Sequence, residues 1–219
     1  MGGVKRPYNS ARRDEQARQT RRAILAAAGR LFVQRGYGST TLQEIADEAG
    51  VAVQTVYASF GKKTTVLEQL LDVSIAGDDA AVAVNDREWM QDVFTHPDPR
   101  ARLQAYAAAV TAIHERAGDI FTVVRSAAAA DSGLVALAVA TEQRRRSGAT
   151  SIVEALDAIG ALRAELSVEE AVDVLWTLNS PDVHRLLVRE SGWPPERFQA
   201  WLASMFIAAL LAAAPRPAG

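Results

Sequence analysis

Two short amphipathic segments joined by one glycine constrain the fold more than any other feature of this sequence. Thr41 and Glu44 have the spacing of a capping box, as do Thr40 and Gln43, so a helix is predicted to start here. Gly50 allows a tight turn before a second short helix begins. The first helix carries apolar side chains at helical spacing: Leu42, Ile45, Ala46 and Ala49. Two short helices around a glycine turn are typical of a helix-turn-helix unit.

A third helix is predicted immediately upstream of this unit. Between Glu15 and Arg35 the apolar residues recur at spacings of three and four, and Gly36 follows where a helix would end. The segments after residue 70 are also helical in pattern. The chain is therefore predicted to be all-α, with a three-helix head at residues 18–66 and a larger helical body at residues 67–219.

Charge is distributed unevenly along the chain. Residues 1–70 hold eleven Lys and Arg against six Asp and Glu, although the 219-residue chain has a net charge of −2. A basic N-terminal third favours a polyanionic partner, while a merely solvated basic surface is the alternative. Residues 1–17 are predicted to be a basic flexible arm. It either contacts DNA or serves as a solubilising tail.

The cellular location is predicted from what the sequence lacks. The chain has no cysteine, which argues against disulfides and thiolate metal sites and favours a reducing compartment. Its N-terminus lacks the apolar segment of a secretory signal, and the apolar run at residues 201–214 is too short to span a bilayer. The protein is predicted to be cytoplasmic.

The second helix of the predicted unit has a face suited to base edges. Gln54 can pair with adenine, and Thr55 offers a hydroxyl and a methyl group. Tyr57 and Ser59 can donate hydrogen bonds to phosphate, and Lys62 follows beside the DNA backbone. The alternative is a solvated turn with Tyr57 as a half-buried core aromatic. The set predicted to contact DNA is Thr41, Gln43, Val53, Gln54, Thr55, Tyr57, Ser59, Lys62 and Lys63.

The stretch "RRAILAAAGRLFVQRGYGSTTLQEIADEAGVAVQTVYASFGKKTTVL" resembles the DNA-binding head of the TetR family of bacterial transcriptional repressors over about residues 18–70. The resemblance implies a homodimer of all-helical chains that binds a DNA operator and a small effector. It implies Thr41, Tyr57 and Lys63 as phosphate contacts, and candidates for base contact at Gln43, Val53, Gln54 and Thr55. Ala52 departs from the family pattern, because a capping Ser is frequent there, and so do the small Ala58 and Ser59.

The body shows no pattern of catalytic residues. It contains no Walker loop, GxSxG or HExxH motif, and its three histidines lack metal-ligand spacing. No catalytic residue, metal or cofactor is therefore predicted, and the chain is interpreted as a ligand-released repressor rather than an enzyme. The alternative function is a helical small-molecule-binding protein or enzyme without sequence-specific DNA binding.

Two polar residues in the body fall on apolar helix stripes, and each needs a partner if it is buried. These are His114 and Asn179, which either form a satisfied core network or line a ligand pocket. Pro-containing breaks at residues 96–99 and 179–182, a capping box from Ser167 to Glu170, and a helix end at residues 116–119 divide the body. The predicted pocket residues are Trp89, Tyr106, His114, Phe121, Arg125, Trp176 and Asn179.

The last helix is predicted to form the dimer seam. Its apolar stripe follows the three-four spacing over more than three turns, long enough for a four-helix bundle between two copies. The alternative is a helix in the core of a single chain. The predicted seam residues are Phe198, Trp201, Leu202, Met205 and Phe206.

Overall fold

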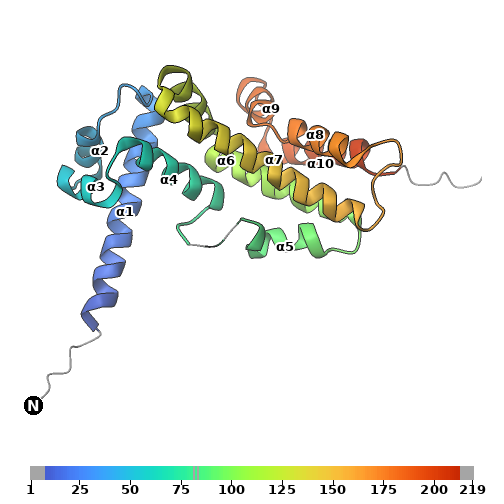
Figure 1. The fold of residues 1–219 in the computed structure, drawn as a ribbon, viewed down its shortest axis with the longest axis horizontal. Coiled ribbons are helices and arrows are strands. Elements are labelled where there is room, and N and C mark those ends of the chain that lie inside the picture. Colours follow the sequence, from blue (N-terminus) through green and yellow to red (C-terminus); the bar gives the residue numbers. More distant parts are fainter. Residues whose placement is uncertain (1–7, 81, 83, 213–219) are drawn as a thin grey trace, which may run out of the picture.

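The computed structural model describes residues 8–80, 82 and 84–212, and the chain in these ranges is helical (Figure 1). Short 3₁₀ turns at Val84–Asp86 and Ser132–Leu134 and a π-helical turn at Arg185–Glu190 connect the longer elements. The α-helices are α1 (Tyr8–Arg35), α2 (Leu42–Ala49), α3 (Val53–Phe60), α4 (Lys63–Ala76), α5 (Glu88–Thr95), α6 (Pro99–Ala130), α7 (Val135–Asp157), α8 (Val168–Leu178), α9 (Pro181–His184) and α10 (Pro195–Leu210). The predicted all-α class is confirmed.

The head consists of α1, α2 and α3, which gather at one end of the molecule. The capping box at Thr41 is present, since the Glu44 amide donates to the Thr41 hydroxyl and the Thr41 amide donates to the Glu44 carboxylate. Gly50 has a φ of 68°, a left-handed conformation that lets the chain turn sharply between α2 and α3. These local features produce the helix-turn-helix that the sequence predicts.

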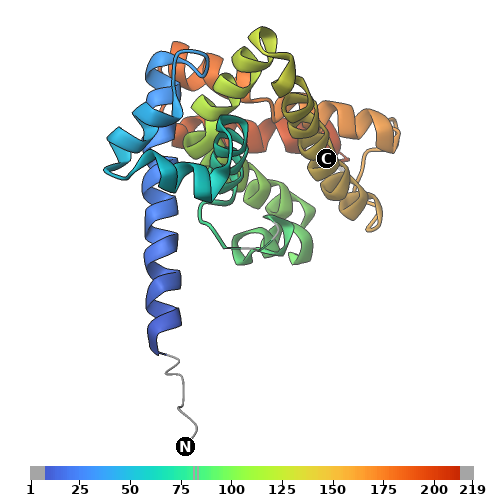
Figure 2. The same ribbon diagram turned by 60° about the vertical axis from the view of Figure 1, so that its left-hand side comes forward.

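The N-terminal part of α1 differs from the prediction of a flexible arm. Residues 8–17 continue the helix, which projects beyond the rest of the chain in both views (Figures 1 and 2). This part of the sequence has no proline or glycine to stop the helix, and Glu15 accepts hydrogen bonds from Arg18 and Gln19 one turn later. Of the basic residues in the predicted arm, Arg12 and Arg13 belong to α1, whereas Lys5 and Arg6 lie outside the described residues.

Two hydrophobic cores meet on α6. The head core combines α1 to α4 with the second half of α6, from Ala117 to Ala127. The body core combines the first half of α6 with α5, α7, α8 and α10. The predicted helix end at residues 116–119 is wrong, because α6 runs through Gly118 to Ala130. The predicted boundary at residue 66 falls inside α4, which runs unbroken from Lys63 to Ala76.

The other predicted breaks in the body are confirmed. The chain leaves α5 at Thr95, and Asp98 caps the start of α6 with Pro99 in its first turn. Ser167 and Glu170 form the predicted capping box of α8. Within the described ranges, none of the helices combines the length and apolar character that crossing a bilayer requires.

Candidate functional site

The exposed face of α3 carries the side chains predicted to contact DNA. Val56 and Phe60 are buried against the head core, so the opposite side of the helix is directed outward. Gln54 is exposed, and Tyr57 is 55% exposed, which contradicts the alternative of a half-buried core aromatic. Thr55 and Ser59 are half-buried. This geometry leaves a polar face on a short helix, which a major groove can accept.

Two of the predicted contacts on α2 already have partners within the chain. Gln43 is exposed but donates from Nε2 to Asp47 at 2.8 Å. The Thr41 hydroxyl donates to the Glu44 carboxylate at 2.9 Å while serving as the helix cap. Both side chains must exchange a local hydrogen bond for one to DNA. Their DNA contacts, like that of the half-buried Val53, remain predictions.

Lys63 has a structural role that the sequence did not suggest. Its Nζ donates to the carbonyls of Tyr37 and Thr40, both at 2.7 Å, and lies 4.2 Å from the centre of the Tyr37 ring. Partial burial lowers the pKa of Lys63 below its ordinary range. The ammonium group therefore ties the start of α4 to the turn before α2, whereas Lys62 is exposed.

We expect Lys63→Met to lower the free energy of unfolding of the protein by about 1–3 kcal/mol, because two carbonyls lose a charged donor. Lys62→Met is the matched control, expected to change stability by less than about 0.5 kcal/mol and to weaken DNA binding. Urea denaturation measures the first effect and salt-dependent DNA titration the second. Equal stability of both variants, with equal loss of DNA affinity, would make Lys63 a phosphate contact only.

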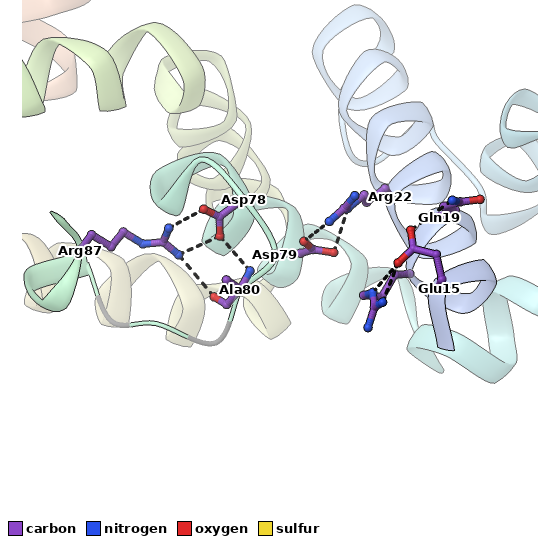
Figure 3. Close-up of polar contacts among 8 residues, drawn as sticks. Glu15, Gln19, Arg22, Asp78, Asp79, Ala80 and Arg87 are labelled. Atoms are coloured by element: carbon purple, nitrogen blue, oxygen red, sulfur yellow. Dashed lines mark hydrogen bonds and ion pairs between the residues drawn. The ribbon is translucent and has the colours of Figure 1, made fainter. Parts of the chain in front are cut away.

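An ion pair joins the head to the segment that follows α4. Arg22 on α1 donates to both carboxylate oxygens of Asp79, at 2.9 and 2.6 Å (Figure 3). The neighbouring Asp78 accepts two hydrogen bonds from Arg87, just before α5, at 2.6 and 3.0 Å. These contacts lower the pKa values of both aspartates, chiefly through hydrogen bonds from the arginines. The Arg22–Asp79 pair therefore ties the residues after α4 to the head, and the Asp78–Arg87 pair joins them to the residue before α5.

A cavity of about 770 Å³ lies between the head and the body. It is bounded by α4, residues 78–80, 82, 84 and 85, α6 and α7, and Arg21 of α1 reaches it. Its walls are mostly apolar. The apolar and aromatic side chains that line it include Val73, Ile75, Met90, Val110, Ile113 and Phe121. A concave, largely apolar site with a few polar groups is typical of a small-molecule pocket.

Three of the predicted pocket residues form one hydrogen-bonded chain on the wall of this cavity. His114 Nε2 lies 3.2 Å from Asn179 Oδ1, and Asn179 Nδ2 donates to the Tyr106 hydroxyl at 2.8 Å. Burial, reinforced by the neighbouring His184 and Arg145, lowers the pKa of His114 to about 3, so the ring is neutral at physiological pH. Burial raises the pKa of Tyr106 to about 12. The three residues are thus hydrogen-bonded to one another and also line a cavity.

The remaining predicted pocket residues do not gather in the same place. Phe121 lines this cavity and a second one of about 500 Å³, bounded by α6, α7 and the turn from α8 to α9. Trp176 and Arg125 line only the second cavity, and Arg125 is ion-paired with Asp182. The prediction of Trp89 is wrong. It is 39% exposed and lines neither cavity, because the buried face of α5 is formed by its neighbours Met90 and Val93.

The predicted dimer seam on α10 needs correction. Phe198, Leu202 and Phe206 are fully buried within the chain, where α10 packs against α6. The three-four spacing identified a buried stripe, but the covering helix belongs to the same chain. Trp201 and Met205 are half-buried, so only these two members of the predicted set retain surface for a partner.

Several residues that position the site had no signal in the sequence. Arg22 pairs with Asp79 across 57 residues of chain and Arg87 pairs with Asp78 across 9, and charged residues of this kind are common on any helix surface. Arg145 is buried to 11% exposure, where it donates to the carbonyls of Trp176 and Asn179 at 3.1 and 2.7 Å. In the sequence it is one of three consecutive arginines, which is the pattern of a solvated face.

Comparison with known proteins places the head in a family. Residues 24–70 match the family model described as bacterial regulatory proteins, tetR family. The chain is 43% identical over 61 residues to the HTH-type transcriptional regulator TtgR of Pseudomonas putida, an alignment covering 28% of this chain and 29% of TtgR. The chain thus matches less than a third of the length of that relative.

Two further similarities extend over the body. The chain is 27% identical over 185 residues to the HTH-type transcriptional repressor BepR of Brucella suis, covering 81% of this chain and 85% of BepR. The crystal structure of NalD, the secondary repressor of the MexAB-OprM multidrug efflux pump in Pseudomonas aeruginosa, covers 90% of this chain and 98% of its own, with a TM-score of 0.64. At 20% identity that likeness shows the fold. These matches place the helix-turn-helix head of this chain in the tetR family of bacterial regulatory proteins, and the body shares the fold of such regulators.

Proposed function

We propose that this protein is a homodimeric transcriptional repressor that leaves a palindromic DNA operator when a small, predominantly apolar effector enters the 770 Å³ cavity. The observation that carries the proposal is the position of this cavity. Its wall includes α4 and residues 78–80, and both of these are bound to the head, α4 by packing and Asp79 by Arg22. The alternative, an enzyme or carrier without specific DNA binding, has no support from family membership.

Release follows if the effector prefers one arrangement of the two heads. Two heads can enter successive major grooves only at one spacing, so a change in their separation lowers operator affinity. An effector that fills the cavity contacts α4 and residues 78–80. Asp79 is joined to α1 by Arg22, and Lys63 joins the start of α4 to the turn before α2. Only a difference in effector affinity between the two arrangements produces release.

The dimer is proposed to use the outer face of α10 together with α8. Trp201 and Met205 are the half-buried members of the predicted stripe, and Ala208 lies exposed one turn beyond Met205. Val168 at the start of α8 is a further exposed apolar residue. Sedimentation of the protein tests this proposal directly, because a chain that remains monomeric at micromolar concentration cannot place two heads on one operator.

The experiment that tests DNA recognition is selection of bound fragments from genomic and random DNA, followed by titration of the selected site. We expect Gln54→Ala to weaken binding to that site by about 1–3 kcal/mol and to relax base preference at one position per half-site. Lys62→Ala is the control, because loss of a phosphate contact weakens binding to all sequences alike and reduces the salt dependence by about one unit. Equal loss on selected and random DNA would remove Gln54 from the base-reading residues.

The effector is sought by thermal shift in a chemically diverse library. A molecule present at a hundred times its dissociation constant stabilises the native state by about 2.7 kcal/mol, enough to move the melting temperature by several degrees. Each hit is then titrated against the protein–operator complex. Hits that stabilise the protein and leave the complex intact would count against release by an effector.

A further inference from the structure

The charged side chains that line the 770 Å³ cavity leave little net charge for a ligand to neutralise. Three arginines and three aspartates line it: Arg21, Arg144, Arg145, Asp72, Asp78 and Asp79. Asp72 pairs with Arg144 at 2.7 Å. Asp78 pairs with Arg87, the residue before α5, and Asp79 pairs with Arg22 of α1. A charged ligand would have to displace one of these pairs or enter the cavity without a partner, which is unfavourable in an apolar site.

The two arginines that remain also have partners. Arg145 pairs with Glu142 at 2.6 Å and donates to two carbonyls at the end of α8. Arg21 faces no carboxylate among the described residues, but its guanidinium donates to the side chain of Gln69 and lies 4.8 Å from the centre of the Phe60 ring. It is held at the head end of the cavity. The cavity as a whole therefore favours an uncharged occupant.

The hydrogen bonds among His114, Asn179 and Tyr106 on the cavity wall run in one direction, and this leaves one donor without an acceptor. Asn179 Nδ2 donates to the Tyr106 hydroxyl, so Asn179 Oδ1 accepts from His114 Nε2–H. The reverse direction would leave His114 with a buried Nδ1–H, and Nδ1 has no hydrogen-bond partner among the described residues. An unpaired acceptor is tolerated more readily than an unpaired N–H donor.

The series of hydrogen bonds from His114 through Asn179 therefore ends in the hydroxyl hydrogen of Tyr106. This hydroxyl receives the hydrogen bond from Asn179, and in the described part of the chain it donates to no other group. The residue is 6% exposed and lines the cavity. Its raised pKa, to about 12, keeps the hydroxyl protonated. A buried hydroxyl donor without an acceptor is costly, and a ligand oxygen can relieve that cost.

We propose that the cavity selects neutral, largely apolar molecules that carry a hydrogen-bond acceptor, such as a carbonyl or ether oxygen, and that the hydroxyl of Tyr106 is the donor that recognises it. This inference rests on the proposed function, since it names the class of effector for the same cavity. It makes Tyr106 a specificity-determining residue, and it excludes carboxylates and ammonium compounds as preferred ligands.

Four molecules built on two phenyl rings test the proposal by calorimetric titration of the full chain. Benzophenone carries a carbonyl acceptor, diphenylmethane has none, diphenylacetate is an anion and benzhydrylammonium is a cation. We expect benzophenone to bind about tenfold more tightly than diphenylmethane, and both ions to bind at least about tenfold more weakly than benzophenone. Binding of either ion as tight as that of benzophenone, or failure of benzophenone to bind up to its solubility limit, would overturn the proposal.

Tyr106→Phe removes this donor, and it also removes the acceptor of the hydrogen bond from Asn179 Nδ2. In this variant we expect the preference for benzophenone over diphenylmethane to fall to about twofold or less, with the affinity for diphenylmethane unchanged. Tyr37→Phe, which alters a buried tyrosine of the head, is the matched control and should retain the full preference. Equal weakening of both molecules by Tyr106→Phe would assign Tyr106 a purely structural role and overturn the proposal.

A spectroscopic measurement on the unaltered protein covers the case in which Tyr106→Phe does not fold. The infrared carbonyl band of ¹³C-labelled benzophenone should move to lower frequency on binding, because a donated hydrogen bond weakens the C=O bond. A bound band at the position seen in an alkane solvent would overturn the proposal. Binding of the selected DNA fragment is measured on the same protein before any ligand is added. Failure to bind DNA would refute the proposed function, whereas DNA binding without a benzophenone preference would refute only the ligand class.

Discussion

Phe206→Ala is expected to lower the free energy of unfolding by about 3–5 kcal/mol, the cost of removing a large aromatic side chain from a packed core. Phe206 is fully buried on α10, and its ring centre lies 5.5 Å from that of Tyr106 on α6. Urea denaturation of the wild type and the variant measures the difference. Because the side chain packs within one chain, sedimentation should give the same oligomeric state for both proteins below the unfolding transition.

Ser204→Ala is the control on the same helix. Its side chain is exposed and, among the described residues, bonds only to the carbonyl one turn back, so a change below about 0.5 kcal/mol is expected. One result would contradict the assignment of Phe206 to the core of a single chain. If Phe206→Ala left stability unchanged but converted a dimer into monomers, Phe206 would belong to the seam that its spacing in the sequence suggested.

The second large effect is a loss of stability in mild acid that depends on His114. Its pKa is about 3 in the folded protein and near 6.5 in an unfolded chain, so below pH 6.5 the unfolded state binds a proton that the folded state does not. Stability is therefore full above pH 6.5 and falls as the pH approaches 3. Between pH 7 and pH 5 the contribution of this one group is about 2 kcal/mol.

His114→Gln removes the titrating group and keeps a polar side chain on the same face of α6. We expect the variant to be less stable than the wild type at pH 7, but to lose about 2 kcal/mol less between pH 7 and pH 5. His184, whose pKa burial also lowers, is present in both proteins and largely cancels from the difference. If the stability of wild type and variant changed with pH in parallel, His114 would have a similar pKa in the folded and the unfolded state.

Features that depend on a few neighbouring residues were predictable from the sequence. The capping boxes at Thr41 and Ser167, the glycine turn at Gly50 and the proline near the start of α6 each act within one helical turn. The exposed face of α3 followed from the same local spacing. This is why the head and most of the breaks in the body were predictable.

Features that depend on contacts between residues far apart in the sequence were not predictable in the same way. Gly118 costs about 1 kcal/mol in a helix, which favoured a break, but burial of Ala117, Ile120 and Phe121 in the head core keeps α6 continuous. The apolar stripe on α10 has the spacing of a buried face, and that spacing is the same whether the covering helix belongs to the same chain or to a partner. Of the predicted pocket residues, Tyr106, His114 and Asn179 meet only because α6 and the end of α8 pack together, and no spacing in the sequence encodes that contact.

The way α6 belongs to two cores limits how the head can be used outside this protein. Its residues from Ala117 to Ala127 complete the hydrophobic core around α1 to α4, although they are separated from α4 by about forty residues of chain. A fragment that ends after α4 would expose the apolar surfaces that this part of α6 covers. The helix-turn-helix therefore cannot be transferred to another protein on its own. A fusion protein that uses it for DNA recognition would also have to contain the second half of α6, or a designed helix with the same apolar face.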